Sequence, residues 1–154
     1  MTGYKKSLRK HVGHSSIIQY GATLIIFDSE RRVLMIRRTD KNCWCFPGGS
    51  VELGEKVENV AIRETLEETG LHAEELKLFG VFSGEELYYK YPNGDEVYNI
   101  DIVYITNKYS GNIAECKSEK ECRFFAIDEL PEKISPPQIP IVNKLKDEFH
   151  QIEL

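Results

Sequence analysis

The segment 56–70 combines three carboxylates with the pattern of a helix that ends at a glycine. At 3.6 residues per turn, Glu64, Glu67 and Glu68 share an arc of roughly 100°. Each like-charge neighbour costs roughly 0.2–0.5 kcal/mol, and the last turn of a helix disfavours anions further. Hard oxygen ligands on one face suit Mg²⁺ or Mn²⁺, which would cancel this repulsion. The cluster therefore predicts a divalent-metal site. The adjoining arc can pack on a sheet and consists of Ala61, Ile62, Thr65, Leu66 and Thr69.

The loop before this helix carries the glycines that such a site needs. Pro47-Gly48-Gly49 allows a close approach of the backbone and offers a carbonyl to a cation, and Gly54 adds a second flexible point. A solvated acidic helix face with lysine partners is the alternative for the glutamates alone, since Arg63 can pair with Glu67 but cannot neutralise three carboxylates. That alternative does not require the glycines.

Other phosphate and metal motifs are excluded by the residues at their key positions. Residues 49–54 have the frame of a nucleotide-binding P-loop, but Glu55 stands where the phosphate-binding lysine belongs and Lys56 replaces the Ser or Thr. An anion at this position would repel phosphate unless a metal intervened. The sequence also lacks a G-x-S-x-G nucleophile elbow and the zincin and EF-hand patterns.

Strands are predicted before the acidic helix. The run 17–28 is long, apolar and rich in β-branched residues, which is typical of a central strand, and 32–38 is expected to return beside it as a hairpin. A short strand at 44–46 stops at the proline and glycines. Residues 1–16 predict an irregular N-terminal arm, because glycine and serine interrupt them.

A tyrosine-rich hairpin and a terminal helix are expected after the acidic helix. The turn 92–95, Pro-Asn-Gly-Asp, joins the two strands of the hairpin. The expected elements are strands at 76–83, 86–91, 96–106 and 123–127 and a final helix at 139–152. Strands that flank one internal and one terminal helix predict a single α/β domain over residues 1–154.

Composition and charge exclude several function classes. Of 154 residues, 41% are hydrophobic and 29% charged, an ordinary balance for one globular domain. The longest apolar run, Ala22 to Phe27, is strand-sized, so no membrane partner is expected. The net charge of −5 argues against a nucleic acid polymer as partner.

The redox state of the four cysteines depends on the cellular compartment of the protein. The N-terminus lacks the apolar segment of a secretory signal, so the cytoplasm is the predicted location. Cys43 and Cys45 would share one face of a strand, which is not a zinc-ribbon spacing. Together with Cys116 and Cys122 they are expected to be reduced.

The segment Gly49 to Leu71 resembles the Nudix box, G-x₅-E-x₇-R-E-U-x-E-E-x-G-U, in which U is a bulky apolar residue. Thr65 departs from this pattern but can still pack through its methyl group. The resemblance implies an α/β/α sandwich with a mixed sheet and hydrolysis of a nucleoside diphosphate linked to another moiety. The literal matches are Gly49, Glu55, Arg63, Glu64, Glu67, Glu68, Gly70 and Leu71.

The resemblance also implies roles for the matched residues. Arg63 would orient the carboxylates in the catalytic centre, and Gly49 and Glu55 would support the loop. The implied metal ligands are Glu64, Glu67, Glu68 and the carbonyl of Gly48.

The reaction needs a base that takes a proton from the attacking water. Glu64 is favoured for this role, ahead of Glu67. A later charged loop offers Glu119 or Glu121 as the alternative, although that loop can equally be a solvated charge run.

Substrate-binding residues are harder to locate. Arg37 and Arg38 end a strand that leads toward the glycines, and on an alternating strand only one of them can face a cleft. Tyr88 could stack on a base or simply pack in its hairpin. Gln138 follows Pro136-Pro137, where a polar group would contact the base by analogy with the family. The other aromatic candidates are Phe82, Tyr89 and Tyr91.

Two substrate classes and two function classes stay open from the sequence. The substrate is an ADP-ribose-like dinucleotide or sugar nucleotide, or a nucleoside triphosphate. The prediction is a Mg²⁺-dependent hydrolase of such a nucleotide, with Mn²⁺ as the alternative metal, acting as a monomer or homodimer. A non-catalytic nucleotide-binding module that keeps the fold is the alternative, although binding alone would not need three helix carboxylates.

Overall fold

The computed structural model describes residues 3–39, 41–113, 116 and 120–154. The helices are α1 (Gly3–Val12), α2 (Val57–Thr69) and α3 (Ile139–Glu148). The strands are β1 (Ile17–Ile26), β2 (Val33–Arg38), β3 (Cys43–Cys45), β4 (Gly48–Ser50), β5 (Leu71–Glu74), β6 (Lys77–Phe82), β7 (Tyr88–Lys90), β8 (Glu96–Thr106), β9 (Lys108–Gly111) and β10 (Lys120–Phe125). Within the described ranges, no helix is both long and apolar enough to cross a membrane.

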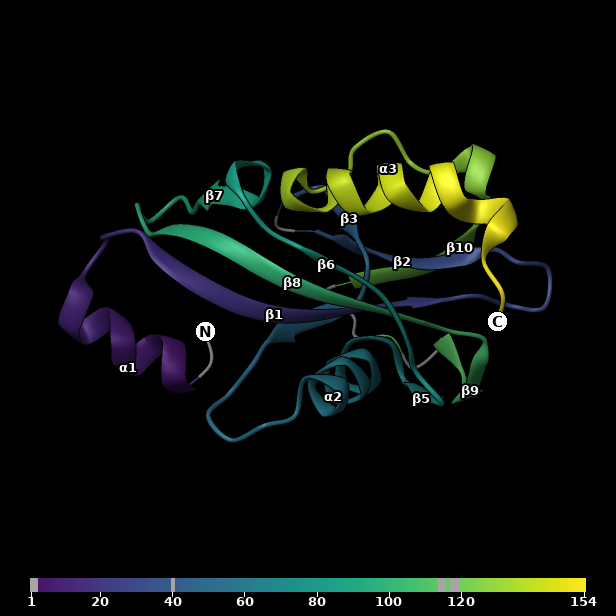
Figure 1. Ribbon diagram of the computed structural model, residues 1–154, viewed down its shortest axis with the longest axis horizontal. Helices are drawn as coiled ribbons and strands as arrows, with labels where there is room; N and C mark the ends of the chain where they lie inside the picture. Colours follow the sequence, from purple (N-terminus) through teal and green to yellow (C-terminus); the bar gives the residue numbers. More distant parts are fainter. Residues whose placement is uncertain (1–2, 40, 114–115, 117–119) are drawn as a thin grey trace.

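The strands form one mixed five-stranded sheet and two smaller antiparallel sheets. In the large sheet β1 runs parallel to β8, whereas β4 pairs antiparallel with β1, and β6 and β7 pair antiparallel with β8. The smaller sheets are β10-β2-β3 and β5-β9. Figure 1 shows α3 on one side of the strands and α2 on the other. The predicted α/β fold with a mixed sheet is confirmed.

Strand β1 holds both helices against the same sheet. Ile25 packs in the apolar cluster under α3, whereas its neighbours Leu24 and Ile26 pack in the cluster under α2. All three side chains are fully buried. Burial of each contributes roughly 1.5–3 kcal/mol, which explains why the run is apolar at every position rather than alternating.

The predicted hairpin between the first two strands is wrong. β1 and β2 share one bridge, Phe27↔Val33, and β2 then joins β10 and β3 in another sheet. Val33 to Ile36 are fully buried on both faces of β2. The apolar pattern identifies β2 as a buried strand, but it carries no information about which strand lies beside it.

Residues 3–12 form helix α1, where an irregular arm was predicted. Arg9 is buried and donates hydrogen bonds to the carbonyls of Gly13 at 2.9 Å, Ser15 at 2.6 Å and Glu96 at 2.8 Å. At the other end of the helix, the backbone N–H of Tyr4 donates to Glu52 at 3.1 Å. The contacts to Glu96 and Glu52, which are distant in the sequence, fix a helix whose own sequence is too polar to predict it.

The cysteine prediction is wrong for one pair. Cys116 and Cys122 form a disulfide, whereas Cys43 and Cys45 are free. The Cα atoms of Cys116 and Cys122 lie 6.3 Å apart, within the reach of a disulfide. The expectation of reduced thiols came from the predicted compartment and not from any geometric feature of this segment.

Candidate active site

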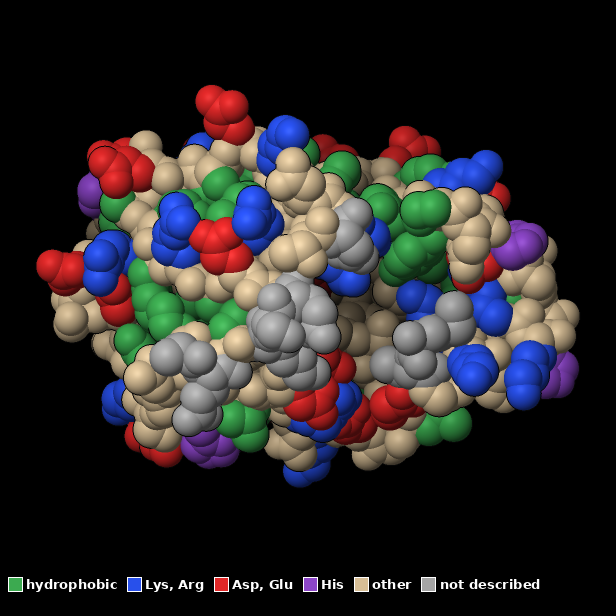
Figure 2. Space-filling view, turned by 180° about the vertical axis from the view of Figure 1, so that it is seen from behind, with side chains coloured by type: hydrophobic (Ala, Val, Ile, Leu, Met, Phe, Trp, Pro, Cys, Tyr) green, Lys and Arg blue, Asp and Glu red, His purple; other side chains and the backbone are tan. Residues whose placement is uncertain are grey.

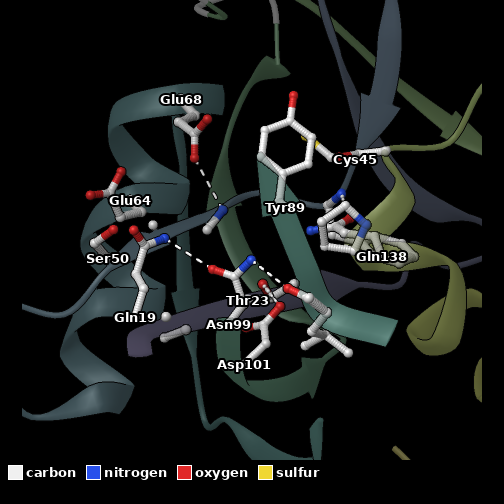
Figure 3. Close-up of a pocket in the computed structure, with 18 of the residues that line it drawn as sticks. Gln19, Thr23, Cys45, Ser50, Glu64, Glu68, Tyr89, Asn99, Asp101 and Gln138 are labelled. Carbon is white, nitrogen blue, oxygen red and sulfur yellow. Dashed lines mark hydrogen bonds between the residues drawn. The ribbon is translucent and has the colours of Figure 1, made fainter. Parts of the chain in front are cut away.

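A cleft of about 620 Å³ opens between α2, β1, β8 and the turn before α3. Cavities of this size accommodate small-molecule ligands. Figure 3 shows Glu64 and Glu68 projecting from α2 on one side, with Tyr89 and Gln138 on the opposite side. Figure 2 shows the hollow from outside, with acidic side chains over the α2 side and basic side chains toward α1.

Helix α2 presents its carboxylates to the cleft because its opposite face is buried. Val60, Ala61 and Thr65 are fully buried against the sheet. Gly70 ends the helix with a left-handed φ of 81°, as predicted. Leu66, which was expected on the packing face, is instead 45% exposed.

The three glutamates differ in burial. The side chains of Glu64 and Glu68 are 16% and 13% exposed, whereas Glu67 is 50% exposed. Glu68 accepts a hydrogen bond from the N–H of Gly48 at 3.1 Å and pairs with Lys120 at 2.7 Å. The structure therefore separates two enclosed carboxylates from one at the rim.

Arg63 links the supporting loop to the helix carboxylates. Its guanidinium donates to both carboxylate oxygens of Glu55, at 2.8 and 3.0 Å, and to Glu64 at 3.0 Å. The hydrogen bond from Arg63 is the main reason why the pKa of Glu55 lies below its usual value. Arg63 also lies 3.6 Å from Glu67. This geometry matches the orienting role that the resemblance implies.

Glu64 is held in an environment that disfavours its negative charge. Burial, followed by the nearby charge of Glu68, raises the pKa of Glu64, and Arg63 offsets only part of this effect. Gly49 packs against the same side chain, because a Cβ built on Gly49 would lie 2.3 Å from Cδ of Glu64. Enclosed carboxylates beside a close-packed glycine backbone are a donor set that fits a hard divalent cation.

These carboxylates have protein partners in the structure. Lys120 and Arg63 supply the counter-charge, and within the described part of the chain no three His, Cys, Asp or Glu side chains converge closely enough to hold a metal as they stand. The fit therefore rests on the chemistry and burial of Glu64 and Glu68.

The two arginines predicted to bind the substrate point to opposite faces of their strand. Arg38 lines the cleft, whereas Arg37 pairs with Glu121 at 2.9 Å and does not. Gln138 also lines the cleft, and its side-chain oxygen accepts the N–H of Phe46 at 2.6 Å. The prediction that one arginine faces the cleft is confirmed, and that residue is Arg38.

Tyr88, which was predicted to contact the substrate, does not line the cleft. Its hydroxyl donates to Glu96 and its ring packs on Tyr98 at 5.2 Å between centroids. Tyr89 and Tyr91 line the cleft instead. Successive residues of a strand point to opposite faces, and the sequence did not indicate which face of this hairpin was turned inward.

Glu119 and Glu121 were the alternatives for the base that takes a proton from the attacking water. Glu121 accepts from Arg37 and Arg123, and it does not line the cleft. Glu119 lies outside the described residues. Glu64 and Glu67 both line the cleft.

The floor of the cleft carries polar residues that the sequence analysis missed. Gln19 donates to Asn99 at 3.0 Å, and Thr23 donates to Asp101 at 2.9 Å, across the parallel pair β1 and β8 (Figure 3). Polar residues at alternating positions in otherwise apolar strands were the signal that could have identified them. Among the described residues, Oδ1 of Asp101 has no hydrogen-bond partner, and burial raises its pKa to about 6.

Replacing Asp101 with asparagine is expected to remove a pH-dependent loss of stability. Because burial raises the pKa of Asp101 to about 6, the folded state keeps its proton up to about pH 6, whereas the unfolded chain releases it near the ordinary aspartate pKa of 3.8. Stability should therefore fall between about pH 4 and 6 by up to about 3 kcal/mol and stay low above pH 6. In Asp101→Asn the part of this slope that Asp101 causes should disappear, and stability at pH 8 should rise. Urea unfolding at several pH values measures both effects.

The exposed Asp147 on α3 supplies the control for this experiment. Asp147→Asn should leave the pH dependence of unfolding unchanged. If Asp101→Asn keeps the wild-type slope between pH 4 and 6, another group causes it.

Sequence comparison finds relatives of known or proposed activity. The chain is 36% identical over 109 residues to an ADP-ribose pyrophosphatase of Methanocaldococcus jannaschii, covering 69% of this chain and 61% of that protein. It is 40% identical over 62 residues to a putative 8-oxo-dGTP diphosphatase of Bacillus subtilis, covering 40% of this chain and 42% of that protein. The matches thus span less than two thirds of either relative.

A solved structure shares the architecture. The MutT NUDIX hydrolase from Burkholderia pseudomallei superposes with a TM-score of 0.69 at 25% identity, covering 84% of this chain and 98% of that one. The NUDIX domain family model matches residues 18–145, which include the cleft floor, the glycine loop and the whole of α2. The chain is therefore a member of the Nudix family.

Proposed function

We propose that this protein is a divalent-cation-dependent hydrolase that cleaves the pyrophosphate linkage of a nucleoside diphosphate derivative. The observation that carries the proposal is the position of Glu64, enclosed in the cleft beside Glu68 and packed on the backbone of Gly49. Two enclosed carboxylates in the last turns of a helix are electrostatically unfavourable, and such local conflicts are typical of functional sites. The relatives named for pyrophosphate or diphosphate cleavage support the same reaction class.

The residues around the cleft would bind the cation, accept a proton and orient the carboxylates. When bound, Mg²⁺ or Mn²⁺ neutralises pyrophosphate oxygens and lowers the pKa of a bound water. Glu64 and Glu68, with the outer Glu67 and the carbonyl of Gly48, would hold the cation. Glu64 would take the proton from the attacking water, since its carboxylate is enclosed in the cleft beside Glu68. Arg63 would keep Glu64 oriented through their 3.0 Å contact.

The polar part of the cleft would recognise the nucleotide. Asn99 and Asp101 on the floor and Gln138 on the wall offer side-chain groups that can read a base or ribose. Arg38 would contact a phosphate. These contacts suit both ADP-ribose-like substrates and nucleoside triphosphates, so the choice between the two is an experimental one.

A turnover screen tests the proposal. The protein is incubated with Mg²⁺ or Mn²⁺ and with nucleoside triphosphates, ADP-ribose, NADH, sugar nucleotides and dinucleoside polyphosphates, and the products are identified by mass. Cleavage of at least one pyrophosphate linkage, abolished by a chelator, is the expected result. Nucleotide binding without turnover under any metal would contradict the hydrolase and favour a binding module.

A further inference from the structure

Helix α1 lies outside the part of the chain that matches the family, yet it reaches the cleft. The match begins at residue 18, whereas Lys5 of α1 lines the cleft. Contacts at both ends fix the helix: Arg9 binds the Glu96 carbonyl at 2.8 Å, and the N–H of Tyr4 binds Glu52 at 3.1 Å. The position of Lys5 is therefore held by the fold and does not depend on the lysine itself.

Lys5 meets a second lysine over a pair of tyrosines. Its ammonium lies 3.2 Å from the hydroxyl of Tyr91 and 4.5 Å from the centre of that ring. The ammonium of Lys41 lies 5.0 Å from the ring centre of Tyr89 and 5.1 Å from that of Tyr91. All four residues line the cleft. Two cations of this kind repel each other, and the tyrosine rings offset the repulsion only in part.

This lysine–tyrosine cluster has no acidic partner in the described part of the chain. No carboxylate of those residues lies within 4.0 Å of the Lys5 or Lys41 ammonium, unlike Lys120, which pairs with Glu68 at the other end of the cleft. The cleft is therefore acidic at α2 and basic at α1, as the distribution of red and blue in Figure 2 shows. Such a gradient favours a ligand with an anionic group at the basic end.

The two tyrosine rings contact each other and the two lysines. Tyr89 and Tyr91 pack edge to face, 4.9 Å apart with an interplanar angle of 83°. Lys41 lies near both rings, and Lys5 lies over Tyr91. Both ammoniums lie within about 5 Å of the centre of the Tyr91 ring, and Lys5 also contacts the Tyr91 hydroxyl, so an anion bound beside this ring would be attracted by both charges.

We propose that Lys5, Lys41 and the hydroxyl of Tyr91 form an anion subsite for a phosphate beyond the one being cleaved. The substrate class is then a nucleotide with three or more phosphates, in preference to a diphosphate that ends in a neutral sugar. This inference rests on the proposed function, because it assumes that the pyrophosphate to be cleaved lies at Glu64 and Glu68.

The first test uses binding alone and needs no turnover. Inorganic tripolyphosphate is titrated calorimetrically into the metal-free protein, into Lys5→Gln and into Lys6→Gln. Lys6 is exposed on the same helix and does not line the cleft, so its variant removes the same charge from the protein without touching the subsite. Lys5→Gln should weaken binding about 5- to 20-fold, and Lys6→Gln less than twofold. Equal affinities for the two variants would overturn the subsite.

The second test compares substrates. In Lys5→Gln, KM for nucleoside triphosphates or dinucleoside tetraphosphates should rise about 5- to 20-fold with kcat nearly unchanged, while KM for ADP-ribose changes much less. A uniform rise for all substrates, or none, would contradict the assigned substrate class. Thermal unfolding of both variants should match the wild type, because Arg9 still anchors the helix.

The two proposals fail in different ways. If the wild type hydrolyses none of these substrates but binds tripolyphosphate through Lys5, the hydrolase proposal and the substrate class that rests on it are wrong, and anion binding at Lys5 stands. If the wild type hydrolyses them but Lys5→Gln behaves as Lys6→Gln in both assays, the subsite is wrong and the hydrolase proposal stands.

Discussion

Glu64→Gln and Glu68→Gln are each expected to lower kcat at least about 100-fold while the protein stays folded. Glutamine keeps the size of the side chain but removes the negative charge that a divalent cation requires and, in Glu64, the group that would take the proton. The metal-free Glu64→Gln variant should be at least as stable as the wild type, because the change removes a buried charge that Glu68 repels. The measurement is initial rate at saturating Mg²⁺, paired with thermal unfolding.

Two further glutamates on α2 make this prediction specific. Glu58 is exposed near the start of the helix, and Glu58→Gln should leave turnover unchanged. Glu67, whose side chain is 50% exposed, should give a smaller loss than Glu64 or Glu68. Wild-type turnover in Glu64→Gln would mean that the catalytic centre lies elsewhere in the cleft.

The acidic helix was predictable because its signals are local. The spacing of Glu64, Glu67 and Glu68 requires only helical periodicity, and Gly70 marks the end of the helix through its own backbone preference. The burial of both faces of β1 is equally local, since Leu24, Ile25 and Ile26 leave no polar face. Features set by neighbours in the sequence were therefore recovered.

Features set by distant contacts were not recovered. Helix α1 depends on the hydrogen bond from Arg9 to Glu96, which is 87 residues away. The partner of β2 is β10, and nothing in either apolar pattern identifies the other. The choice of Tyr89 over Tyr88 for the cleft depends on which face of a short strand the fold turns inward. In each case tertiary packing decides between alternatives that the local sequence leaves equal.

The glycine loop combines a feature that the local sequence predicts with one that depends on distant contacts. The sequence indicated that Gly48 and Gly49 permit a close approach, but it did not show what approaches. A Cβ on Gly48 would lie 2.4 Å from the backbone oxygen of Ala22, whereas a Cβ on Gly49 would lie 2.3 Å from the side chain of Glu64. A backbone neighbour cannot move aside, whereas a glutamate side chain can. Gly48 is therefore required for the packing of the strands, and Gly49 for the position of the Glu64 carboxylate.

Gly49→Ala is therefore expected to lower kcat about 10- to 100-fold with a stability loss of no more than about 1 kcal/mol. The new methyl group pushes the Glu64 carboxylate out of its place, and the flexible side chain accommodates this at little cost in stability. Gly54→Ala is the matched control in the same loop, because Gly54 has a left-handed φ of 76° and open space around it. It should cost about 1 kcal/mol in stability and leave kcat intact. Steady-state kinetics measures kcat, and urea unfolding measures stability, for both variants. Equal kcat values for Gly49→Ala and Gly54→Ala would show that Glu64 need not occupy the position seen in the structure.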